Sequence, residues 1–138
     1  MTIPRSSRRR FLTASAATGV GLGLLPAVSW GRVLGANERL NFAIIGTGGM
    51  GSTHLRSLVN RKEAENIDVI QVCDVYRRRL NGAMAAIGKG DQAGTLEYRE
   101  VIDNPEVDAI VIATPDHWHT KIAIEAMENG KDVYVEKP

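Results

Sequence analysis

A glycine-rich segment has the residue types and the spacing of a phosphate-binding turn. It reads Gly46-Thr47-Gly48-Gly49-Met50-Gly51 and fits the pattern G-x-G-x-x-G. The first glycine permits a tight turn, the second lets the backbone approach a ligand, and the third lets a helix pack closely on a strand. Unpaired N–H groups and the dipole at the start of such a helix favour a phosphate. We therefore expect all six residues to contact a dinucleotide; a plain glycine-rich turn is the alternative.

An acidic residue follows this segment at the distance typical of a nucleotide site. Asp74 comes about 20 residues after the third glycine, directly behind an apolar run. Its carboxylate can accept hydrogen bonds from both hydroxyls of an adenosine ribose and would repel the 2′-phosphate of NADP. Three arginines follow at positions 77–79, of which Arg77 is the candidate for a phosphate contact, unless they form only a solvated helix start. The sequence therefore favours NAD over NADP.

Two further segments carry polar side chains where apolar runs end. They are Thr114-Pro115-Asp116-His117-Trp118-His119 and Glu136-Lys137-Pro138. Ligands of open α/β sheets bind outside the carboxyl ends of the strands, so these segments, the glycine-rich turn and Asp74 should meet in one crevice. The two histidines lack a third ligand, and Asp116 would more simply cap the following helix, so we predict no metal site.

The elements that must position these residues alternate between strand and helix. Expected strands are apolar or β-branched runs over residues 41–46, 67–73, 95–97, 108–113 and 132–135. Expected helices have apolar residues three and four apart and cover residues 50–61, 78–87, 98–103 and the region around 122–127. Apolar strands separated by helices predict an α/β fold with a doubly wound parallel sheet.

Composition limits the classes of function. Of 138 residues, 43% are hydrophobic and 24% are charged, as in an ordinary globular domain. The net charge of +1 hides an asymmetry: the first 39 residues hold six basic residues and one acidic residue, so the remainder is acidic overall. An acidic body without a basic stripe argues against a nucleic-acid partner. The single cysteine, Cys73, excludes an internal disulfide framework and a zinc site built from cysteines.

The motifs together resemble the Gfo/Idh/MocA family of oxidoreductases. The likeness rests on the segments Ala113 to His119 and Gly130 to Pro138 and extends over residues 40–138. Members of that family join a Rossmann domain to an α/β substrate domain, and most transfer hydride between a nicotinamide and a sugar or cyclitol carbon. The resemblance implies that residues 40–138 are a truncated NAD(P)-binding Rossmann domain. It also implies that the substrate domain, with the acid–base residues, is absent from this chain.

The resemblance assigns roles to individual residues. It places Lys137 beside the nicotinamide and the substrate, as the catalytic residue, and Glu136 next to it as a cofactor contact. It places Thr114, Pro115 and His119 along the nicotinamide side of the cofactor. A protonated Lys137 would stabilise negative charge on the substrate oxygen while a base from the missing domain takes the hydroxyl proton. A surface lysine at a strand end is the alternative.

Two other functions stay open. Some relatives of the resembled family cleave glycosidic bonds through transient oxidation by bound NAD, so that the net reaction is hydrolysis. A non-catalytic binding protein stabilised by its cofactor is the third possibility. In each case the partner is a small carbohydrate or cyclitol, and we expect the full-length protein to be a homo-oligomer.

Residues 1–36 resemble a twin-arginine export signal with a linker. Ser7-Arg8-Arg9-Arg10-Phe11-Leu12 is similar to the motif S-R-R-x-F-L, and an uncharged stretch follows from Ala14 to Val28. A solvated basic N-terminus is the alternative. The resemblance implies recognition by the twin-arginine export machinery and a periplasmic or otherwise exported protein. Because that machinery moves folded proteins, we also expect the cofactor to be held tightly.

Overall fold

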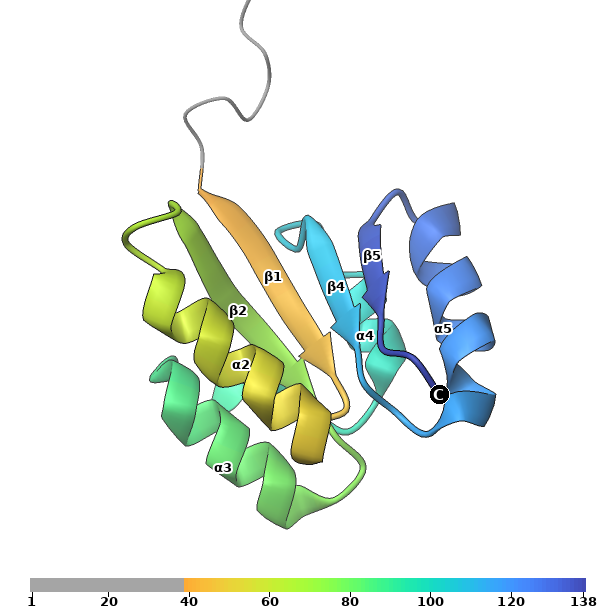
Figure 1. The fold of residues 1–138 in the computed structure, drawn as a ribbon, viewed down its shortest axis with the longest axis horizontal. Helices are drawn as coiled ribbons and strands as arrows, with labels where there is room; N and C mark the ends of the chain where they lie inside the picture. Colours follow the sequence, from red (N-terminus) through yellow and green to blue (C-terminus); the bar gives the residue numbers. More distant parts are fainter. Residues whose placement is uncertain (1–38) are drawn as a thin grey trace, which may run out of the picture. The chain divides into compact units, whose positions relative to one another are not determined.

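A five-stranded sheet is the centre of the computed structural model, which describes residues 39–138. The strands are β1 (Leu40–Ile45), β2 (Ile67–Cys73), β3 (Gly94–Thr95), β4 (Ala109–Ile112) and β5 (Asp132–Val135). The helices are α2 (Gly49–Arg61), α3 (Arg77–Ile87), α4 (Tyr98–Ile102) and α5 (Asp116–Glu128), with a 3-10 turn η1 at Asp91–Ala93. All strand pairs are parallel, in the order β3-β2-β1-β4-β5 (Figure 1). The predicted fold class is confirmed.

The helices bury the two faces of the sheet separately. Side chains of β1 alternate between the layers: Ile44 packs in the core under α2 and α3, whereas Ala43 and Ile45 pack in the core under α4 and α5. Both faces are covered there, which explains why β2 and β4 are almost continuously apolar. The strand order reverses at β1, with β2 and β3 on one side and β4 and β5 on the other. Such a reversal is where open α/β sheets bind ligands.

The α3 helix ends where the sequence predicts. Gly88 adopts φ +67, a left-handed conformation that suits glycine, and its N–H donates to the carbonyl of Met84. Upstream, the apolar residues Leu80 and Ala83 are buried against the sheet. The amphipathic pattern and the terminal glycine therefore define this helix together.

Two local expectations were wrong. The third strand was predicted over residues 95–97 but ends at Thr95, because Glu97 caps α4 by accepting a hydrogen bond from the Arg99 N–H. Asp116 was expected to cap α5, yet it is the first helical residue; Pro115 occupies the N-terminal capping position and makes no side-chain capping bond. Asp116 instead places its negative charge in the first turn, where the helix dipole favours it.

The described residues bear on membrane insertion but not on the predicted export signal. Within residues 39–138, no helix is both long and apolar enough to cross a membrane. The predicted export signal over residues 1–36 lies outside the described residues.

Candidate functional site

The first and third glycines of the turn lie where a side chain would collide with backbone. Gly46 follows β1 with φ +90, and a Cβ atom there would lie 2.7 Å from the carbonyl carbon and oxygen of Ala113 at the end of β4. A Cβ atom on Gly51 would overlap the carbonyl oxygen of Gly46. The tight turn and the close helix–strand contact predicted for these glycines are therefore present, and they bring the start of α2 onto the ends of β1 and β4.

The middle of the turn is open instead of packed. A Cβ atom on Gly48 would meet only the side chain of Arg79, at 3.4 Å from Nη1, and one on Gly49 would meet nothing within 4 Å. Gly48 precedes α2 in an extended conformation, and no acidic residue occupies the first turn of the helix. The first N–H groups of a helix have no partner within it, so this end presents donors and space to an anion. The turn fits a dinucleotide pyrophosphate.

Asp74 ties the end of β2 to the glycine-rich turn. Its buried carboxylate accepts through Oδ2 from the Thr47 N–H at 2.8 Å and from the Thr47 hydroxyl at 3.0 Å. Oδ1 accepts from the Tyr76 N–H at 2.8 Å. An ionised carboxylate has about four lone-pair sites, so roughly one is left for a ribose hydroxyl. That site is on Oδ1, and a second ribose bond would have to displace or share a bond from Thr47 or Tyr76.

The arginine beside the turn is Arg79. Its guanidinium lies next to Gly48 and over the Tyr76 ring, with 5.8 Å from Cζ to the ring centroid. Arg77, the predicted candidate, is the first residue of α3 and is exposed. Residues in a helix lean toward its N-terminus, which directs Arg79 back over Tyr76. That geometry appears only once the helix start is known, so the run of three arginines alone did not single out Arg79.

The turn that follows β4 is held by a contact between its backbone and a histidine of α5. His119 is buried, and its Nε2 atom is 2.7 Å from the carbonyl oxygen of Thr114. The Thr114 hydroxyl oxygen is buried and has no hydrogen-bond partner among residues 39–138. Because a buried polar atom without a partner is costly, this hydroxyl is suited to a ligand group. His119 supports the turn, and its predicted contact with the cofactor stays a prediction, as does that of Pro115.

The end of β5 places Lys137 at the same edge. The Glu136 N–H continues the sheet by donating to the carbonyl of Ile112, and Lys137 is exposed, with no ion pair within the described part of the chain. The Glu136 carboxylate contacts His54 Nε2 at 2.8 Å and accepts from the Lys137 N–H at 3.1 Å. The His54 bond, followed by the Lys137 N–H, holds the pKa of Glu136 below its usual 4.5. His54 was not predicted as a site residue.

These four segments lie together as predicted. Gly46, Asp74, Thr114 and Lys137 follow the carboxyl ends of β1, β2, β4 and β5, and hydrogen bonds from Gly46 to Cys73 and from Ala113 to Ile45 join neighbouring ends. Between residues 39 and 138, no group of three His, Cys, Asp or Glu side chains could hold a metal ion. The edge therefore brings together a helix start suited to an anion, the buried carboxylate of Asp74 and the exposed side chain of Lys137.

Residues 40–138 match the profile of the GFO_IDH_MocA family, described as an oxidoreductase family with an NAD-binding Rossmann fold. The chain belongs to this family. Its described part is thus an NAD-binding Rossmann domain of the Gfo/Idh/MocA type, as the sequence motifs predicted. Similar solved structures hold the same cofactor: the WlbA dehydrogenase from Bordetella pertussis contains NADH and UDP-GlcNAcA.

Two solved structures and one curated protein illustrate the likeness. Myo-inositol 2-dehydrogenase from Lactobacillus plantarum has a TM-score of 0.66 and 33% identity, over 73% of this chain and 29% of that chain. The Bordetella WlbA dehydrogenase has a TM-score of 0.64 and 26% identity, over 73% and 29%. The alpha-N-acetylgalactosaminidase of Shewanella oneidensis is 28% identical over 95% of this chain and 33% of its own length. The chain spans about a third of the length of the curated relatives it matches, 33% and 28% for two of them.

Proposed function

We propose that the full-length protein is an NAD-dependent dehydrogenase acting on a hydroxyl carbon of a sugar or cyclitol, and that this chain is its nucleotide-binding half. The observation that carries the proposal is the meeting of the glycine-rich turn, Asp74, the Thr114 turn and Lys137 at one edge of the sheet. The names of similar structures, a myo-inositol 2-dehydrogenase and a dehydrogenase in complex with UDP-GlcNAcA, support a carbohydrate or cyclitol substrate.

Each part of the edge has a role in that reaction. The start of α2 would bind the pyrophosphate, and the remaining acceptor capacity of Asp74 would orient the adenosine ribose. When bound, NAD supplies a nicotinamide carbon that accepts or returns hydride. The Lys137 ammonium, free of any ion pair in the described chain, would stabilise negative charge on the substrate oxygen. A base outside residues 39–138 would take the hydroxyl proton.

The preference for NAD over NADP follows from Asp74. In the proposed complex its buried carboxylate would lie beside the ribose hydroxyls, and two like charges 4 Å apart repel by roughly 4 kcal/mol at an effective dielectric constant of 20. Arg79, beside Gly48, is the group in a position to offset that repulsion. We propose that Asp74 dominates because it is fixed by three hydrogen bonds, whereas among residues 39–138 the Arg79 guanidinium is held by its contact with the Tyr76 ring.

The proposal is tested by turnover of the full-length protein. NAD and a panel of sugars and cyclitols are supplied, and NADH formation is followed by absorbance. We expect at least one substrate to give NADH, and Lys137→Met to lower kcat by about 100-fold or more. Absence of turnover across the panel, or full activity of Lys137→Met, would contradict the proposed reaction or the proposed role of Lys137, respectively.

A second candidate is glycoside hydrolysis through transient oxidation. It is favoured by the likeness to the Shewanella oneidensis alpha-N-acetylgalactosaminidase. In that reaction the hydride returns to the substrate, so NAD is neither consumed nor released and the sugar is set free. Release of the aglycone from an aryl glycoside without net NADH would favour hydrolysis, whereas NADH in proportion to product would favour the dehydrogenase.

We further propose that residues 1–36 direct export through the twin-arginine pathway and that the full-length protein is a homo-oligomer. Replacing Arg8 and Arg9 by lysine should stop export of a folded reporter fused to these residues, and continued export would contradict the proposed export signal.

Light scattering of the purified full-length protein tests the proposed homo-oligomer, since a monomeric mass would contradict it.

A further inference from the structure

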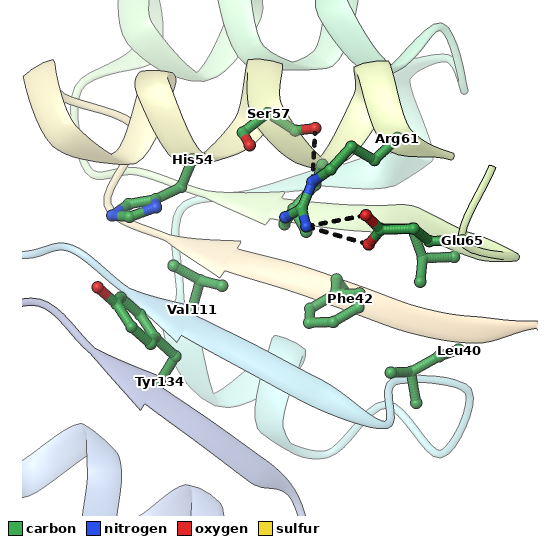
Figure 2. A pocket seen from close by; sticks show the side chains of 10 residues that line it. Leu40, Phe42, His54, Ser57, Arg61, Glu65, Val111 and Tyr134 are labelled. Carbon is green, nitrogen blue, oxygen red and sulfur yellow. Dashed lines mark hydrogen bonds and ion pairs between the residues drawn. The ribbon is translucent and has the colours of Figure 1, made fainter. Parts of the chain in front are cut away.

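One histidine of α2 contacts the segment that carries Lys137. His54 lies in the second turn of α2, with its Nε2 atom 2.8 Å from Oε2 of Glu136. Its ring packs edge-on against Tyr134, with 5.3 Å between centroids. Figure 2 shows His54 and Tyr134 facing each other across a groove between α2 and the strands β1, β4 and β5. Two side chains at or just beyond the end of β5 thus hold this ring.

The Glu136 carboxylate connects α2 to the backbone of the next residue. Oε2 contacts His54, and Oε1 accepts from the Lys137 N–H at 3.1 Å. The low pKa of Glu136 keeps it ionised at neutral pH, so His54 Nε2 donates the proton in their bond. Within residues 39–138, the segment after β5 is also held by the bond from the Glu136 N–H to the carbonyl of Ile112. The Glu136 carboxylate, held by His54, therefore helps to fix the backbone of Lys137 relative to α2.

We propose that His54 is a positioning residue that acts through Glu136 to fix the backbone of Lys137 relative to α2. The inference rests on the proposed function, in which the Lys137 ammonium acts on the substrate oxygen. The start of α2 would bind the cofactor pyrophosphate, while Lys137 would act at the nicotinamide end. The His54–Glu136 pair connects these two ends of the site. A displacement of about 1 Å in a catalytic group such as Lys137 can lower a rate by about 100-fold.

Geometry favours positioning over a direct cofactor contact by Glu136. Both carboxylate oxygens are oriented by the chain itself, one by His54 and one by the Lys137 N–H, and these two bonds use about two of the four lone-pair sites of the carboxylate. The side chains of Glu136 and His54 are 14% and 25% exposed, so the pair is largely covered. A covered contact of this kind restricts the motion of both side chains, so it can orient the segment that carries Lys137.

The test uses the full-length protein and five variants. His54→Ala and Glu136→Ala break the pair singly and together, and His54→Gln restores a donor near the place of Nε2. Glu65→Ala is the matched control, because Glu65 pairs with Arg61 of α2 at the other end of the same groove (Figure 2). The measurements are kcat and KM for the substrate, the dissociation constant of NAD, and hydrogen exchange of the Lys137 amide.

We expect each single alanine variant to lower kcat by about 10- to 100-fold while the NAD dissociation constant changes by less than about threefold. The double variant should be no worse than the more damaging single one, within about threefold, because both break the same contact. His54→Gln should recover much of kcat, and Glu65→Ala should leave it unchanged. Additive losses, or weaker NAD binding with unchanged kcat, would overturn the proposal; the latter would assign Glu136 to the cofactor.

Amide exchange separates this inference from the proposed function. If the wild-type protein turns over no substrate, the proposed function fails while the exchange measurement still applies. Faster exchange of the Lys137 amide in His54→Ala supports the positioning contact, and unchanged exchange overturns it. Should His54→Ala fail to fold, the comparison of wild type with His54→Gln and Glu136→Gln decides: His54→Gln should keep the Lys137 amide protected, and equal exchange in all three proteins overturns the proposal.

Discussion

Replacement of Gly51 by alanine tests the packing that brings the glycine-rich turn onto the sheet. The added Cβ atom would overlap the backbone oxygen of Gly46, which cannot rotate away, so α2 would have to move off β1. Overpacking costs about 1–3 kcal/mol, and contact with backbone puts this site at the upper end. Replacing glycine by alanine within a helix raises the free energy of unfolding by about 1 kcal/mol through helix propensity. We expect Gly51→Ala to lower the free energy of unfolding by about 2 kcal/mol.

Gly82→Ala provides the matched control. Gly82 lies inside α3, and a Cβ atom there would meet nothing within 4 Å, so this variant should gain about 1 kcal/mol from helix propensity alone. The two variants should therefore differ by about 3 kcal/mol in urea denaturation without NAD, followed by circular dichroism. Equal stability of Gly51→Ala and Gly82→Ala would refute the argument that the third glycine is required by close helix–strand contact.

Three further outcomes are expected in the full-length protein. Asp74→Asn removes the charge that opposes a 2′-phosphate, so the ratio of NADP to NAD dissociation constants should fall by about tenfold or more, measured by calorimetry; an unchanged ratio would assign the preference to another group. In the folded protein Cys73 should not react with a thiol reagent at about pH 8, because burial and, to a smaller extent, the charge of Asp74 raise its pKa to about 12. Folded wild type and Cys73→Ala should then be labelled to the same extent. Folding lowers the pKa of Glu136, so the ionised carboxylate stabilises the folded protein fully above the usual pKa of 4.5, and this stabilisation is lost as the pH falls through the pKa of the folded state. The difference in melting temperature between wild type and Glu136→Gln should therefore shrink on acidification, and a difference that does not change with pH would contradict this expectation.

Features of the fold and site that depend on residues close together in the sequence could be predicted from the sequence. The apolar runs at β1 and β4 and the glycine spacing at Gly46 and Gly51 follow from periodicity and turn geometry. Because the ends of parallel strands meet at one edge, the convergence of Asp74 and Lys137 also followed from the strand assignment.

The contacts that were missed depend on how side chains meet in three dimensions. Arg79 was not singled out over Arg77, because the choice depends on the start of α3 and on the direction of its side chains. His54 lies on a helix far from Glu136 in sequence, and no local signal links the two. Asp74 was expected to accept hydrogen bonds from the ribose, and no local pattern indicated that its carboxylate also accepts from the Thr47 N–H.

The central claim, that the glycine-rich turn at this sheet edge binds NAD, is tested most directly by calorimetric titration of the full-length protein and its Gly48→Val variant. Within 4 Å, a Cβ atom on Gly48 would meet only the flexible Arg79 side chain, and the extended conformation of Gly48 suits valine, so the fold should tolerate the change. The valine would occupy the space offered to the pyrophosphate. We expect NAD affinity to fall by at least about tenfold, or 1.4 kcal/mol, with an unchanged unfolding midpoint in the absence of NAD. Equal affinity in the two proteins would contradict the assignment.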